Sequence, residues 1–245
     1  MKASYVLAAA LLIVPASANA QDEGEGVRGR WSATFTGGAA MPAGGEFHEA
    51  GLGTVLGLPT SVDAKKTSDI FDPGVGWRAG IGYGVSRNVE LFGDFVWGKA
   101  EASELSVGNV ASLDLRAAFG DYKNYGMDGG VRYHFVPGAR VAPYVSALAG
   151  FRRVDSISGT FSVPAAGVTL PDTPFFDDST VPVFGGDLGV LFAVSGRISL
   201  GVETGIRYHT DLSDIEGLAG TGLENLNDAG SRWSVPITGV VRFGF

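Results

Sequence analysis

Charged side chains recur singly inside otherwise apolar stretches of this chain of 245 residues, and they are the first candidates for chemistry. Acids and arginines spaced in this way can carry protons or ions along a path. They can also neutralise one another as ion pairs, because unpaired charge in a low-dielectric interior is strongly disfavoured. Their near balance favours a paired plug, and the conducting path stays as the alternative. The set consists of Arg78, Glu90, Asp94, Asp128, Arg132, Asp187, Glu203, Arg207 and Arg242.

The composition excludes several other chemistries. The chain has no Cys, so disulfide scaffolds, thiolate metal sites and cysteine nucleophiles are absent. Three His leave little material for a transition-metal site, and the glycine-rich runs do not open a helix as a phosphate-binding loop would. A net charge of −8 argues against a nucleic-acid partner. We therefore expect no cofactor and no metal.

The first twenty residues have the pattern of a signal peptide. Lys2 supplies a positive start, an apolar run follows over residues 5–14, and Ala18-Asn19-Ala20 fits a signal-peptidase site. The alternative, a membrane anchor, is disfavoured because the run is shorter than the ~20 residues that a spanning helix needs. The sequence predicts a signal peptide at 1–20, a short periplasmic segment at 21–30 and one further domain at 31–245.

The remainder alternates between apolar and polar or small residues with a period of two, which indicates β-strands. In residues 75–85, for example, Trp77, Ile81 and Tyr83 fall on one face and Arg78 falls on the other with the glycines. The facing of residues 142–151 is not determined by the pattern. The predicted strands span 31–40, 75–85, 89–97, 125–135, 142–151, 183–194, 198–209 and 233–245.

Short and long connections alternate strictly between these strands. The long ones lie near 41–74, 100–124, 152–182 and 210–231. An even number of roughly ten-residue strands with this alternation predicts an all-β fold, an eight-stranded antiparallel up-and-down transmembrane β-barrel. A soluble β-sandwich is the alternative, and aromatic residues near the strand ends on the apolar face favour the barrel. These predicted membrane-interface aromatics are Trp77, Tyr83, Trp97, Tyr133, Tyr208 and Trp233.

The chain resembles the small eight-stranded outer-membrane barrel family, which includes the OmpA transmembrane domain, OmpX and the opacity-like surface proteins. The most specific feature is the end, Val241-Arg242-Phe243-Gly244-Phe245, which is similar to the signal read by the barrel-assembly machinery. Phe243 and Phe245 would carry that signal. The resemblance implies a location in the bacterial outer membrane, with outer-membrane lipids and lipopolysaccharide as further partners.

The histidines do not complete a catalytic site. Asp211 stands two residues after His209, and Val136 stands two residues after His134. Outer-membrane lipid A deacylases, which are eight-stranded barrels, have a His-x-Ser pair, and this chain lacks the serine at both places. We therefore expect no catalytic residue and no enzyme.

The long connections are acidic, yet they contain apolar segments at 52–58, 163–170 and 175–176. These segments could extend the barrel wall as strand pairs, which we favour, or form a patch for an unknown surface ligand. The expected function is a structural and surface-presenting outer-membrane protein with a plugged lumen. A porin-like channel for ions or small solutes is the alternative, and a lipid-modifying enzyme is a weaker third.

Overall fold

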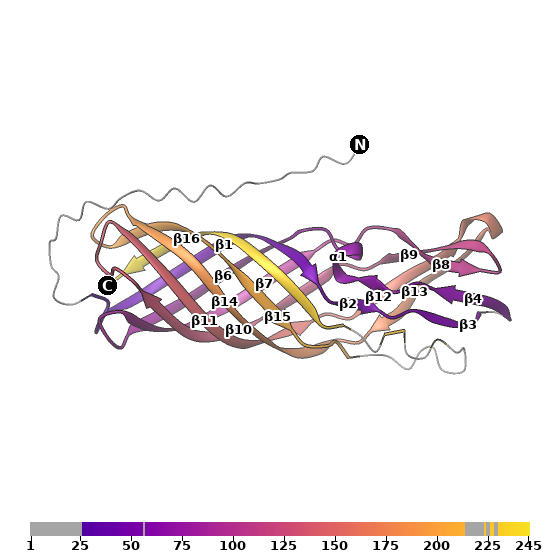
Figure 1. Cartoon of the computed structure of the whole chain (residues 1–245), viewed down its shortest axis with the longest axis horizontal. Helices are drawn as coiled ribbons and strands as arrows, with labels where there is room; N and C mark the ends of the chain where they lie inside the picture. Colours follow the sequence, from indigo (N-terminus) through magenta and orange to yellow (C-terminus); the bar gives the residue numbers. More distant parts are fainter. Residues whose placement is uncertain (1–25, 56, 214–222, 224–225, 228–229) are drawn as a thin grey trace.

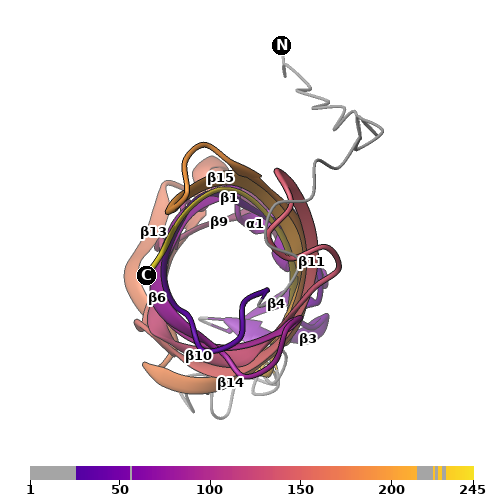
Figure 2. The same ribbon diagram turned by 90° about the vertical axis from the view of Figure 1, so that its left-hand side faces the viewer.

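The protein is described here by a computed structural model that covers residues 26–55, 57–213, 223, 226–227 and 230–245. Its main element is a closed antiparallel barrel in the strand order β1-β16-β15-β14-β11-β10-β7-β6 (Figures 1 and 2). The predicted fold class is confirmed. The barrel strands are β1 (Trp31–Gly44), β6 (Gly74–Gly84), β7 (Val89–Ala100), β10 (Tyr122–His134), β11 (Val141–Val154), β14 (Ser179–Ala193), β15 (Ile198–His209) and β16 (Arg232–Gly244).

The period of two in the sequence becomes the two faces of the barrel wall. Outward positions carry large apolar side chains that the protein leaves uncovered, such as Phe35, Ile81 and Leu188. Most inward positions carry small, polar or charged side chains, and a few carry large apolar ones such as Phe92 and Leu191. The last strand closes on the first, with Phe35 opposite Val241. The barrel therefore has no free edge, which satisfies the backbone of every wall strand.

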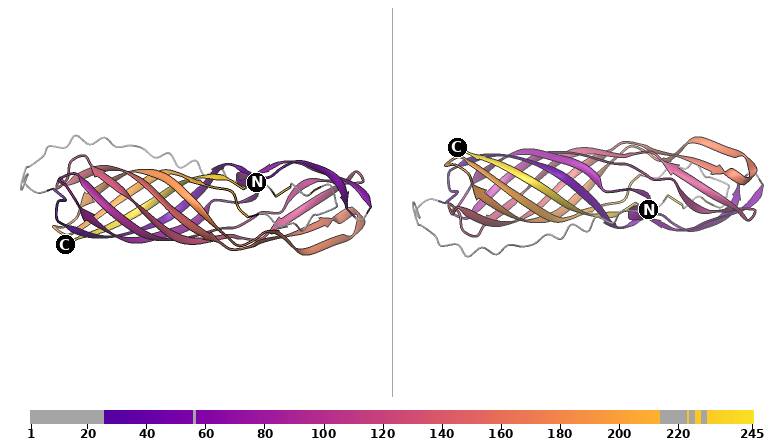
Figure 3. Two further views of the ribbon diagram at one scale, coloured as in Figure 1. Left: turned by 90° about the horizontal axis from the view of Figure 1, so that it is seen from below. Right: turned by 90° about the horizontal axis from the view of Figure 1, so that it is seen from above.

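The first three long connections form a second sheet beyond one end of the barrel. This six-stranded sheet has the order β13-β12-β9-β8-β4-β3 and continues the long axis of the molecule (Figure 3). Its strands are β3 (Gly51–Val55), β4 (Leu58–Val62), β8 (Leu105–Val110), β9 (Leu113–Phe119), β12 (Ile157–Val163) and β13 (Val168–Phe176). The apolar segments of the connections thus form strand pairs, as we favoured. We call this sheet, together with the other residues of the first three long connections, the extension.

The remaining elements lie within the first and third long connections. β2 (Glu46–His48) pairs with β5 (Lys65–Lys66), and the short helix α1 (Thr67–Ile70) follows directly. The one-turn 3-10 helix η1 (Pro164–Ala166) joins β12 to β13. Among the described residues there is no helix whose length and apolar character would let it cross a membrane.

An aromatic cluster holds the extension together. Phe47 packs edge to face against Phe119 at 5.0 Å and stacks with Phe175 at 5.8 Å between ring centroids. His48 is buried beside them, and its Nδ1 lies 3.1 Å from the Glu49 carbonyl oxygen. Desolvation by burial lowers the pKa of His48 below its ordinary value. The extension therefore has a hydrophobic core of its own.

Several predicted strands are too short: β1 continues to Gly44, β10 begins at Tyr122 and β14 begins at Ser179. Two further boundaries change the barrel interior. The third long connection was expected to begin at residue 152, but β11 continues to Val154 and places Arg152 inside the barrel. The last strand was expected to begin at residue 233, but it begins at Arg232, which is also buried. In both places the strand continues toward the extension, and the arginine beyond the predicted strand end faces the barrel interior. The predicted signal peptide at 1–20 lies outside the described residues.

Candidate functional site

The interior of the barrel gathers the charged residues that the sequence singled out. Eight of them are at most 8% exposed as whole residues, namely Arg78, Glu90, Asp94, Asp128, Arg132, Asp187, Glu203 and Arg207. Arg242, the ninth, has a side chain that is 17% exposed. Each stands at an inward position of its strand, because alternate residues of a strand share one face. The cluster therefore fills the lumen.

The part of the cluster near the short turns is built around one carboxylate. Glu90 on β7 accepts a charge-assisted hydrogen bond from Arg242 at 2.9 Å and lies 3.5 Å from Arg132 Nη1. His134 Nε2 lies 2.7 Å from the same oxygen, Oε2, and Ser32 donates a hydrogen bond to the other oxygen, Oε1. One carboxylate thus faces two guanidinium groups, and the Arg132 guanidinium also stacks 4.8 Å from the Phe92 ring centroid.

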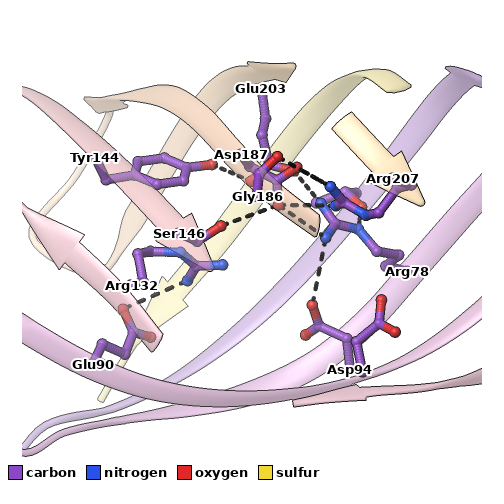
Figure 4. A network of polar contacts seen from close by, with 12 residues as sticks. Arg78, Glu90, Asp94, Arg132, Tyr144, Ser146, Gly186, Asp187, Glu203 and Arg207 are labelled. Atoms are coloured by element: carbon purple, nitrogen blue, oxygen red, sulfur yellow. Dashed lines mark hydrogen bonds and ion pairs between the residues drawn. The ribbon is translucent and has the colours of Figure 1, made fainter. Parts of the chain in front are cut away.

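The middle of the lumen is a denser network that crosses the barrel (Figure 4). Arg78 on β6 pairs with Glu203 on β15 and lies 3.5 Å from Asp187 on β14. Arg207 binds Asp187 from the neighbouring strand at 2.7 Å, and Tyr144 donates a hydrogen bond to Glu203 at 2.7 Å. These contacts join opposite walls. They leave the centre of the lumen occupied by side chains, as eight-stranded barrels of this width allow.

Sequence reasoning missed several members of this interior. Tyr144 and Ser146 on β11 were missed because the facing of that strand was not determined. Arg152 makes a two-pronged ion pair with Asp128, at 2.6 and 2.7 Å. Arg232 lies on the inner face as well. The signal that could have found the two arginines is the same period of two, continued past the predicted strand ends.

The histidines lie apart from any hydrolytic arrangement in the described part of the chain. His134 contacts the Glu90 carboxylate, and that carboxylate, not the histidine, receives the Ser32 hydroxyl. A serine nucleophile would need its hydroxyl hydrogen-bonded to the histidine. His209 is buried next to Arg232, its register partner on β16.

The predicted interface aromatics stand on the outer face in two groups. Tyr83 contacts Trp31 at 4.9 Å near the short turns. Toward the extension, Tyr208 contacts Trp233 at 4.8 Å. Trp77, six residues before Tyr83 on β6, is about 20 Å away along the strand. Tyr133 lies on the outer face near the short turns, and Trp97 is the register partner of Trp77.

The chain end closes the barrel. Phe243 and Phe245 are both exposed, and Phe245 exchanges backbone hydrogen bonds with Trp31 at 3.0 Å each way. Their role as an assembly signal stays a prediction.

Comparison with known proteins shows similarity to barrels only at the level of structure. Neisserial surface protein A is 16% identical, with 88% of this chain and 96% of that chain covered and a TM-score of 0.45. OprG from Pseudomonas aeruginosa is 10% identical, with 90% and 98% covered and a TM-score of 0.47. Ail of Yersinia pestis is 13% identical, with 89% and 99% covered and a TM-score of 0.41. No protein-family model matches the chain, and a search of curated proteins found no match.

The fold is established by the strand pairing itself. A closed barrel is one of the two structures that can span a membrane, because every wall strand satisfies its backbone within the wall. An apolar outer face around a polar interior is the arrangement of bacterial outer-membrane barrels. The chain is a small eight-stranded outer-membrane β-barrel, and the predicted localisation is confirmed.

Proposed function

We propose that this protein is a structural and surface-presenting barrel with a plugged lumen, which anchors a rigid β-extension in the outer membrane. The observation that supports this best is the ion-paired network across the lumen. Arg78 alone connects β6 to β14 and β15, so paired side chains bridge the middle of the barrel. No enzymatic role is part of the proposal.

The extension supports the presenting role. Its sheet is built from three long connections and has an aromatic core, so it can hold its exposed residues in fixed positions. At its tip, Leu52 on β3 is 80% exposed. A contiguous strand with an uncovered apolar side chain is a surface that a partner could pair with.

The plug is tested by planar-bilayer conductance of the refolded mature chain, wild type beside Arg132→Ala. We expect no steady current from the wild type. A steady wild-type current that changes in Arg132→Ala would replace the structural proposal with the channel. Gel mobility before and after boiling shows that both proteins are folded barrels.

The orientation is tested by cysteine labelling in intact cells, which is clean because the chain has no Cys. A membrane-impermeant maleimide should label Leu52→Cys at the tip of the extension. It should label Ser86→Cys, in a short turn at the other end, only after the outer membrane is opened. The reverse pattern would contradict surface presentation.

A further inference from the structure

The upper part of the barrel, between the charge network and α1, contains a cavity of about 150 Å³. Arg78 forms its floor, and Thr67 and Phe71 from the first long connection border it on the side of the extension. Small or apolar inward residues such as Ala40, Val96 and Pro236 line its sides. A cavity of this volume can hold a ring of six carbon atoms. We call it the upper chamber.

Polar atoms without partners face this chamber. His209 is 8% exposed, and its Nδ1 atom has no hydrogen-bond partner among the described residues. The Oγ1 atoms of Thr67 and Thr238 also lack a partner there. All three residues line the chamber. A buried polar group without a partner costs free energy, so several of them around one space indicate a missing occupant.

The charge around the chamber has one sign. Arg78, Arg152, Arg207 and Arg232 line it, and none of the described residues that line it is acidic. The first three are paired with carboxylates below or beside them. Arg232 is 6% exposed and contacts only the Tyr122 hydroxyl, the Tyr122 ring at 4.4 Å and the Gly230 carbonyl oxygen among the described residues.

Arg232 therefore lacks a carboxylate partner within the described chain. Its two side-chain hydrogen bonds to described residues use only part of the five N–H donors of a guanidinium. His209 is its register partner on the neighbouring strand, so the two side chains emerge next to each other on the inner face. A buried, uncompensated arginine is costly unless an anion accompanies it.

We propose that the upper chamber binds a small monocarboxylate with an apolar body, held at its charged end by Arg232 with His209 and packed against Val96, Phe71 and Pro236. One guanidinium without a carboxylate partner among the described residues matches a single negative charge. The volume limits the apolar body to about the size of a benzene ring. This proposal goes beyond the structural function, because the plug below the chamber closes the lumen whether or not the chamber is occupied.

The test is calorimetric titration of benzoate into the refolded mature chain in detergent, with benzyl alcohol as the uncharged analogue. We expect saturable binding of one benzoate, and weaker binding of benzyl alcohol by about tenfold or more, because hydrogen bonds to charged groups are the strong class.

Three variants sharpen the test. Arg232→Gln should weaken benzoate binding by about tenfold or more, and Val96→Phe should abolish it by filling the space. Arg116→Gln, on the exposed face of β9, should bind as the wild type does. If Arg232→Gln fails to show the mobility of a folded barrel, His209→Leu takes its place, with an expected loss of about threefold to tenfold.

The proposal is overturned by any of three results. The first is no benzoate binding at millimolar concentration, which would mean that water alone fills the chamber. The second is equal uptake by wild type and Val96→Phe, which would place benzoate in the detergent. The third is equal affinity for benzoate and benzyl alcohol, which would remove the role of Arg232.

Discussion

Replacing Glu90 by glutamine should destabilise the barrel more than any single loss of charge at its surface. The Glu90 side chain is 1% exposed and faces Arg242 at 2.9 Å and Arg132 at 3.5 Å. Glutamine keeps the size and an acceptor oxygen but leaves both arginines without their nearest carboxylate. Breaking a buried ion pair from one side costs about 3–5 kcal/mol. Because glutamine retains part of the hydrogen bonding, we expect about 3 kcal/mol.

The measurement is urea unfolding of the refolded chain in lipid vesicles, followed by gel mobility and by tryptophan fluorescence. The matched control is Glu101→Gln, whose side chain is 75% exposed and pairs with Lys99 at 3.1 Å. An exposed pair of this kind contributes about 0–1 kcal/mol, so the control should unfold close to the wild type. The double variant Glu90→Gln, Arg242→Gln should recover part of the loss, since it removes one of the stranded charges.

A loss in Glu90→Gln as small as in Glu101→Gln would refute the reasoning. It would mean that water screens the lumen charges and that ion pairing does not hold them. The plug would then be solvated, and the conducting path would become the better reading of the same residues.

Three further predictions concern other parts of the chain. Because burial lowers the pKa of His48, the unfolded extension binds a proton that the folded extension does not, so the stability of the extension should be complete above about pH 6.5 and fall as the pH drops toward the lowered pKa. Proteolysis of the extension should therefore accelerate between about pH 7.5 and 5.5 in the wild type but not in His48→Gln. Phe47→Ala should cost about 3–5 kcal/mol within the extension and expose it to protease, while the barrel keeps its shift in gel mobility on boiling. Gly80→Ala should impair barrel assembly, because the added methyl group would clash with the Gly93 carbonyl oxygen and the Asp94 carboxylate. Gly129→Ala is the control: its added methyl group would make only an ordinary contact at 3.9 Å, so this variant should assemble normally in the same gel assay.

The wall of the barrel could be predicted from sequence because its physical signal is local. Lipid on one side and a polar interior on the other impose the period of two on every strand, so the inward position of Arg78 or Glu203 follows from its neighbours in the chain. The alternation of apolar and polar residues weakens only at the strand ends toward the extension, where it no longer separates an apolar face from a polar one. Arg152 and Arg232 lie there, and both were assigned to connections or strand ends.

The partners within the lumen could not be predicted from sequence. Arg78 and Glu203 are separated by 125 positions, and they meet because strand tilt and register bring β6 and β15 to the same height on opposite walls. The same holds for the extension, where β4 pairs with β8 and β9 with β12 from different connections. Alternation predicts that a residue faces inward, but it does not predict the height at which the residue meets the other strands.

The two added arginines change what the lumen charges imply. With the residues predicted from sequence, acids and arginines nearly balance, and a neutral plug accounts for all of them. With Arg152 and Arg232 included, the arginines outnumber the carboxylates of the described lumen, and Arg232, which has no carboxylate partner among the described residues, faces the upper chamber. The structure therefore separates two tests. Conductance with Arg132→Ala examines the plug, and benzoate binding with Arg232→Gln examines the chamber above it. Benzoate binding that survives in a folded Arg132→Ala barrel would show that the chamber recognises its ligand independently of the seal beneath it.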